Sequence, residues 1–333
     1  MKMLDQQEFK SKKREKLLDF DTYKTNFTEA IYAFDIVRQS LEQPASILES
    51  LDPYDVMVAT KQRAWEGINH LANCYSGGHD IVDLASIYPS VIEYFEVFAH
   101  FSKRFKESNA SNPSAVAHLA LQGSDYSIIN RLLSLGICLG WEKLIPRLVP
   151  LIDYNNPLRD GLVERLLQFY MPGRGTFPAD CTRHLPYFKT IKIFSSKDDR
   201  AALLAEYLSE WYNASRREPY FESHKKGLSF YGYWAWEAAA IAVVLRIDDT
   251  PLKETQFYPV DLVAYARKIS IENKDRKNES SELRAKAGDV CPKSGLWHTL
   301  DIPIKSESYL AGDVMKGSRS PYGLTVWIYA RHD

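Results

Sequence analysis

Apolar residues recur at the spacing of an α-helix through most of the first 270 residues. Charged residues fall between them, and pairs that contain Gly or Pro separate one stripe from the next. The pattern therefore predicts a series of helices of ordinary length joined by short links. The clearest stripes are Phe27, Ala30, Ile31, Phe34 and Val37; Trp65, Ile68, Leu71 and Ala72; and Val91, Tyr94, Phe95, Phe98 and Phe101.

The middle of the chain has fewer charges. Residues 128–151 are strongly apolar, and we expect Pro146 and Pro150 to divide them into short helices because proline interrupts the helical hydrogen-bond ladder. Residues 174–186 contain more Gly, Pro and Thr, which indicates a loop and a subdomain boundary. A charged helix is predicted over residues 198–211.

An apolar segment at residues 228–245 is just long enough to span a membrane. It contains Glu237, however, and a carboxylate inside a bilayer is strongly unfavourable. We interpret the segment as a buried core helix. The N-terminal residues have charges but no apolar segment typical of a secretory signal. These features predict a soluble, cytoplasmic protein without a membrane partner.

The last part of the chain changes character. Residues 271–287 are highly charged and indicate a linker or an exposed helix. Residues 288–333 have short apolar runs between Gly, Pro and Ser, and residues 325–329 (TVWIY) are typical of a strand. The predicted fold is mainly α: a multi-helix, bundle-like body with a small C-terminal β module of SH3-like type.

Four segments follow from these patterns. We predict an N-terminal helical domain at residues 1–175, a C-terminal helical domain at 176–270, a charged linker at 271–287 and the β module at 288–333.

The charge balance excludes some classes of partner. Lys and Arg number 42 and Asp and Glu 43, so the net charge of −1 does not indicate direct binding of nucleic acid. The basic run KSKKREK at residues 10–16 is flanked by acids and is interpreted as a solvated helix face. The four cysteines lie far apart, which fits a reducing compartment.

Catalytic and metal-binding signatures are sparse. Cys181 and His184 lie three residues apart and Cys291 and His298 seven, but no further Cys or His stands near either pair. Both spacings are explained better by chance than by a catalytic or metal-binding site. We therefore expect no catalytic residue, no metal site and no cofactor.

Acidic residues are the candidate contacts with a partner. Glu237 lies in an apolar helix, so its carboxylate must be paired, hydrogen-bonded or protonated, and a structural role is favoured over a catalytic or partner-binding one. Asp198, Asp199, Asp248 and Asp249 form two pairs at predicted helix ends. They fit helix caps, and they also fit an acidic patch that faces a basic partner.

Three ordered motifs resemble a known family. FYGYWAWEAAAIA at residues 230–242, IDD at 247–249 and FYPVDLV at 257–263 resemble the C-terminal domain of PoNi-type bacterial immunity proteins. The N-terminal half is similar to the companion domain more loosely, through YSGG at 75–78 and LSLG at 133–136. The resemblance extends over roughly residues 20–270.

The tail resembles a small β module found at the end of several bacterial immunity proteins. It contains AGDVCPKSGLW at residues 287–297 and GDVM at 312–315. Lys316 stands where this module often has proline. The tail is an addition to the two-domain pattern, and the resemblance therefore implies that the chain belongs to a neighbouring immunity subfamily.

The resemblance implies a non-enzymatic inhibitor. Such a protein binds a cognate polymorphic toxin, typically a DNase delivered between bacteria by type VI or related secretion, and blocks its active site or its DNA-binding surface. The candidate contacts are then Asp198, Asp199, Asp248, Asp249 and Glu237. The alternatives are a hydrolase that uses Glu237 or Cys291 and a helical scaffold, and exposed apolar surface is compatible with a homodimer.

Overall fold

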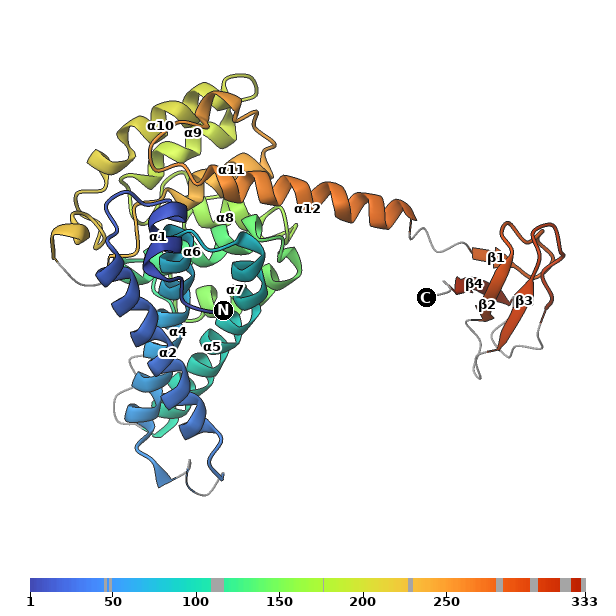
Figure 1. Ribbon diagram of the computed structural model, residues 1–333, viewed down its shortest axis with the longest axis horizontal. Coiled ribbons are helices and arrows are strands. Elements are labelled where there is room, and N and C mark those ends of the chain that lie inside the picture. Colours follow the sequence, from blue (N-terminus) through green and yellow to red (C-terminus); the bar gives the residue numbers. More distant parts are fainter. Residues whose placement is uncertain are drawn as a thin grey trace. The chain divides into compact units, whose positions relative to one another are not determined.

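The computed structural model describes residues 1–44, 47, 50–108, 117–175, 177–226, 230–279, 284–299, 305–317 and 325–330. The chain divides into two compact units, Met1–Arg267 and Lys268–Asp333, each with its own hydrophobic core. The first unit is helical, and the second contains a four-stranded antiparallel sheet (Figure 1). The prediction of a mainly helical fold with a small C-terminal β module is confirmed.

Helices that pack side by side form the N-terminal part of the first unit (Figure 1). They are α1 (Gln6–Lys12), α2 (Phe20–Leu41), α4 (Pro53–Gly77) and α5 (Ile81–Ser108). The apolar stripes predicted α2, α4 and α5, and most of each stripe faces the core. Ile31 is an exception, because 38% of it is exposed at the surface of α2.

The helix ends follow from capping chemistry. Asp5 and Glu8 form a capping box at the start of α1, and the Asp52 carboxylate accepts bonds from the first amides of α4. At the other end of α4, Gly78 adopts a left-handed conformation with φ of 95°.

Shorter helices are formed by the apolar middle of the chain. They are α6 (Gly123–Cys138), the 3-10 helix η1 (Glu142–Leu144), α7 (Ile145–Asp153) and α8 (Gly161–Leu167). Pro146 lies in the first turn of α7, where proline is tolerated. The prediction that Pro150 ends a helix is wrong: it lies inside α7, where its missing N–H removes only one bond of the ladder.

The remaining helical segments follow in the chain, and the last of them, α12, begins in the first unit and continues into the second. In chain order they are η2 (Tyr187–Lys189), α9 (Thr190–Ser195), α10 (Arg200–Ala214), η3 (Ser223–Lys226), α11 (Trp236–Val244), η4 (Thr250–Leu252) and α12 (Val260–Glu279). Every residue from Trp236 to Ala242 of α11 is buried, and α11 packs against α6. The second half of the segment predicted as a core helix is thus one, whereas residues 230–235 are not helical and Leu228 lies outside the described residues.

The basic run near the N-terminus is less solvated than predicted. Arg14 donates to the Asp261 carboxylate at 2.6 Å and to the carbonyls of Tyr75 and His79 at 2.9 Å each. Its side chain therefore joins the ends of α1 and α4 to the start of α12. The prediction of a purely solvated face is wrong for this residue, because backbone carbonyls at the end of α4 accept its hydrogen bonds.

The second unit has strands β1 (Arg284–Lys286), β2 (Gly295–Thr299), β3 (Ser306–Tyr309) and β4 (Val326–Ala330). They pair in the order β1-β4-β2-β3, with all pairings antiparallel. Trp297, Trp327 and Met315 form the centre of its core. The strand predicted at residues 325–329 corresponds to β4.

Among the residues that the structure describes, none of the helices combines the length and the apolar character needed to cross a membrane.

Candidate functional site

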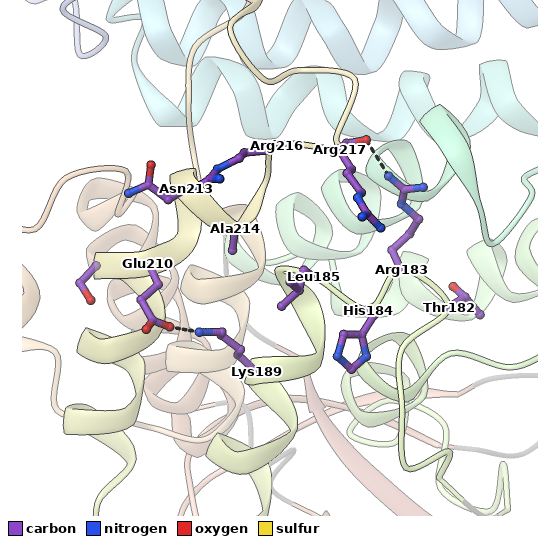
Figure 2. Close-up of a pocket in the computed structure, with 11 residues that line it drawn as sticks. Thr182, Arg183, His184, Leu185, Lys189, Glu210, Asn213, Ala214, Arg216 and Arg217 are labelled. Atoms are coloured by element: carbon purple, nitrogen blue, oxygen red, sulfur yellow. Dashed lines mark hydrogen bonds and ion pairs between the residues drawn. The ribbon is translucent and has the colours of Figure 1, made fainter.

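A groove of about 800 Å³ lies between residues 182–189 and the C-terminal end of α10 (Figure 2). The loop before α9 provides one wall, and the other wall is α10 with the residues that follow it. The lining residues are Thr182, Arg183, His184, Leu185, Lys189, Ser209, Glu210, Asn213, Ala214, Arg216 and Arg217.

Positive side chains dominate this groove. Lys189 forms an ion pair with Glu210, which is the acidic residue among the lining side chains. Within the described part of the chain, no hydrogen-bonding or ionic partner is found for the exposed guanidinium groups of Arg216 and Arg217. Both arginines directly follow α10, where the helix dipole favours positive charge.

Arg183 is held in place by a buried acid. Its Nε and Nη2 donate to Oε1 of Glu218 at 2.9 and 2.5 Å, and Nη2 also donates to the Arg217 carbonyl at 2.9 Å. Burial raises the pKa of the Glu218 carboxyl, and the Arg183 charge opposes this rise. The ion pair thus joins the two walls of the groove.

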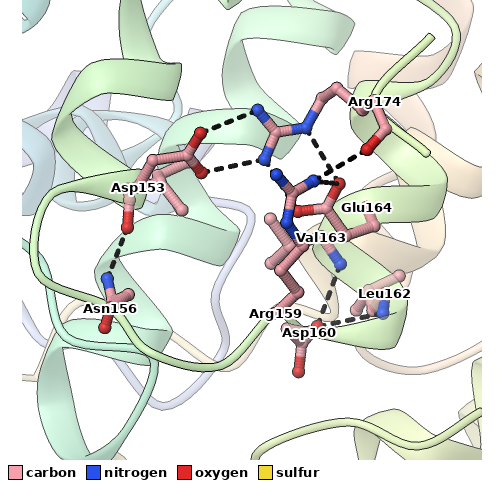
Figure 3. Close-up of polar contacts among 9 residues, drawn as sticks. Asp153, Asn156, Arg159, Asp160, Leu162, Val163, Glu164 and Arg174 are labelled. Carbon is pink, nitrogen blue, oxygen red and sulfur yellow. Dashed lines mark hydrogen bonds and ion pairs between the residues drawn. The ribbon is translucent and has the colours of Figure 1, made fainter. Parts of the chain in front are cut away.

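Asp160 anchors the loop that carries Arg183. Its Oδ1 caps α8 by accepting from the amides of Leu162 and Val163 at 2.9 Å each, as Figure 3 shows. Its Oδ2 accepts from the Thr182 amide at 2.7 Å. The side chain is fully buried, and burial raises its pKa, although these donors oppose the rise.

A second clamp holds the preceding part of the loop (Figure 3). The Arg174 guanidinium donates to both Glu164 oxygens at 2.7 and 2.8 Å and to both Asp153 oxygens at 2.8 and 3.0 Å. These two carboxylates raise the pKa of Arg174. Residue 174 is thereby fixed to α8 and to the end of α7.

Glu237 lies on the inner side of α10, behind the groove. Its Oε1 accepts hydrogen bonds from the Tyr207 hydroxyl at 2.6 Å and from Trp211 Nε1 at 2.8 Å. Burial raises its pKa to about 7. The adjoining cavity has about 20 Å³, enough for about one water molecule. Glu237 therefore has a structural contact, made with Tyr and Trp donors.

The four candidate aspartates divide into surface and interior residues. Asp198, Asp199 and Asp248 are exposed, and hydrogen bonds from Thr250 lower the pKa of Asp248. Asp249 is 2% exposed, accepts from the Tyr258 hydroxyl at 2.9 Å and is paired with Arg267. The structure does not bring the five acids together at one site, since Glu237 and Asp249 are enclosed.

The cysteine–histidine pairs show ordinary local contacts. His184 bonds Asp180 at 2.9 Å, whereas burial raises the pKa of the Cys181 thiol. The Cys291 thiol donates to the Lys293 carbonyl at 3.1 Å. In the described residues no three His, Cys, Asp or Glu side chains gather as a metal site.

Sequence reasoning missed the basic groove. Its side chains come from a loop and from a helix end that are separated by about 20 residues, so no periodic pattern marks them. The adjacent Arg216 and Arg217 after a predicted helix were the available signal.

Comparisons with known proteins identify the segment that contains the groove. Residues 158–262 match the family model of the C-terminal domain of PoNe immunity proteins (PoNi). The resemblance to this domain is thus confirmed over that segment. The looser resemblances of the N-terminal half and of the tail stay predictions.

The fold is also similar to a solved structure. The crystal structure of protein PA2201 from Pseudomonas aeruginosa matches with a TM-score of 0.64 and 23% identity, covering 76% of this chain and 90% of that chain. The search among curated proteins gives no match.

Proposed function

We propose that this protein binds and neutralises a cognate PoNe-type DNase toxin. The observation that carries the proposal is the match of residues 158–262 to the C-terminal domain of PoNe immunity proteins, because that family is described by its action on such toxins. Neutralisation is proposed to proceed by stoichiometric binding that covers the active site or the DNA-binding surface. The protein itself is proposed to perform no catalysis.

The enzyme alternative has less support. A hydrolase would use Glu237 or Cys291, yet these residues are only 2% and 1% exposed. The cavity beside Glu237 admits about one water molecule and therefore no substrate of ordinary size.

Exposed acids are proposed to guide the approach of the toxin. A DNA-binding surface is positively charged, so Asp198, Asp199 and Asp248 attract it over several ångströms and accelerate association. Glu237 and Asp249 are also candidates for a role in toxin binding. Their proposed role is indirect: they support the packing of α10 and α12.

Association kinetics with the proposed cognate nuclease domain test both the binding and its electrostatic guidance. We expect the wild type to bind, with association that slows as salt rises. The triple variant D198K/D199K/D248K is expected to associate about tenfold more slowly at low ionic strength, with little change in dissociation. Surface plasmon resonance at two salt concentrations measures both rates.

A matched control carries the same change of charge on other helices. Asp21, Glu29 and Glu107 are exposed on α2 and α5, outside the matched segment, and D21K/E29K/E107K should associate faster than the triple variant. Absence of wild-type binding would contradict the proposed function. An association rate that is equal for wild type and triple variant at low salt would remove the electrostatic part alone.

A further inference from the structure

We propose that the basic groove between residues 182–189 and the end of α10 receives carboxylate side chains of the bound toxin. This inference rests on the proposed function and adds the chemistry of one contact. The groove lies wholly within the segment that matches the immunity domain. The groove therefore belongs to the part of the chain that the family match relates to toxin immunity.

Charge is the first argument. Lys189 and Arg183 are neutralised by Glu210 and Glu218, which leaves the charges of Arg216 and Arg217 uncompensated beside the groove within the described residues. The whole chain has a net charge of −1, so this local surplus is not a consequence of a basic protein. A concave surface with a surplus of positive charge concentrates anionic ligands.

Rigidity is the second argument. Arg183 is 24% exposed in its side chain and fixed by a Glu218 carboxylate that is fully enclosed. Asp160 and Arg174 hold the loop before it through hydrogen bonds of 2.7–3.1 Å. A site whose walls are ordered before binding loses less conformational entropy when a partner enters.

The side-chain chemistry favours carboxylates. Arginine presents a planar fork of donors that matches both oxygens of Asp or Glu, and two such groups face this groove. Leu185 and Ala214 are the apolar residues of the lining, and the others have polar or charged side chains.

Nucleic acid is a poorer fit. Binding of a single strand normally uses aromatic side chains on which bases stack, and the lining contains only the imidazole of His184, which already stacks on Phe188. Glu210 and Asp180 also place negative charge at the groove and beside His184.

The test uses the full-length protein and defined probes. Calorimetric titrations compare an octa-aspartate peptide, an octa-lysine peptide and the oligonucleotide dT8. We expect the wild type to bind octa-aspartate, not octa-lysine, and to bind dT8 more weakly. The variant R216E/R217E should lose at least about tenfold in affinity for octa-aspartate and for the proposed cognate toxin domain.

Two further variants separate charge from folding. R216Q/R217Q removes the charges without reversing them and should give an intermediate loss, while circular dichroism verifies that both variants keep the helical fold. K197E/K253E changes the charge by the same amount at exposed sites of the matched segment outside the groove, and it should retain octa-aspartate binding.

Three results would overturn the inference. The first is a toxin complex of R216E/R217E as tight as that of the wild type, and the second is equal loss in K197E/K253E. The third is binding of dT8 as tight as that of octa-aspartate with the same dependence on Arg216 and Arg217, which would assign the groove to nucleic acid. If wild type binds octa-aspartate in the groove but no toxin, the proposed function fails and the carboxylate chemistry stands.

Discussion

At the scale of single residues, Glu237 shows how burial produces a measurable property. Its pKa is raised to about 7, whereas an exposed glutamate titrates near 4.5. The contribution to stability is therefore fully present below pH 4.5 and is lost as pH rises through 7, because the folded protein must then hold a buried charge.

We predict that E237Q removes this pH dependence. At pH 5 the carboxyl in the folded wild type is mostly neutral, and the variant should be more stable by at most about 1 kcal/mol. At pH 8 the variant should be more stable by about 3 kcal/mol, since each unit of pKa corresponds to about 1.4 kcal/mol. Its amide oxygen still accepts from Tyr207 and Trp211.

Urea unfolding at the two pH values, followed by circular dichroism, measures the difference. Glu206 is exposed on the same helix as the two donors, so E206Q serves as the control and should track the wild type at both pH values. A difference between E237Q and wild type that is the same at pH 5 and pH 8 would refute the explanation by burial.

The sequence predicted part of this residue-level picture. An acid in an apolar helix identifies Glu237 as buried and bonded, but its donors Tyr207 and Trp211 lie 30 and 26 residues away on α10. The adjacent Asp248 and Asp249 look equivalent in sequence, yet only the second faces the interior. Such differences depend on tertiary packing, which a single sequence does not specify.

At the scale of elements, a single glycine ends α4 and lies against the end of α1. Gly78 has φ of 95°, and its amide donates to the carbonyls of Cys74 and Tyr75 at 3.1 Å each. A β-carbon at this position would lie 2.2 Å from the Lys12 carbonyl oxygen at the end of α1. Both the conformation and the close approach of α1 require glycine.

We predict that G78A lowers the free energy of unfolding by about 3 kcal/mol, from the left-handed conformation and the backbone clash together. Gly123 provides a matched control. It also has a positive φ, of 58°, but a β-carbon added there would have no atom within 4 Å, so G123A should cost about 1 kcal/mol. Urea unfolding of the two variants compares them, and equal losses would show that the contact with Lys12 contributes nothing.

Helices could be predicted from the sequence where apolar residues repeat regularly, as in α2, α4 and α5. The groove could not be predicted, because a loop and a helix end provide its walls and neither has a periodic pattern of apolar residues. The hydrogen bond that holds this loop also joins distant residues: Asp160 at the start of α8 accepts from Thr182, which is 22 residues further along the chain.

At the scale of the whole molecule, two compact units with separate cores follow each other in the chain. The immunity-domain match lies entirely in the helical unit. Its surface presents exposed acids before α10 and a basic groove at the end of the same helix. Charges of both signs on one segment suit a protein partner with a mixed surface better than a uniform polyanion.

The central claim, neutralisation of a toxin by binding, is tested most directly by co-expression in bacteria. The proposed cognate nuclease domain is induced with and without this protein, growth is followed, and the complex is recovered by affinity pull-down. The account predicts restored growth together with a stable complex. Continued killing without a complex, although the protein is soluble and folded, would contradict it.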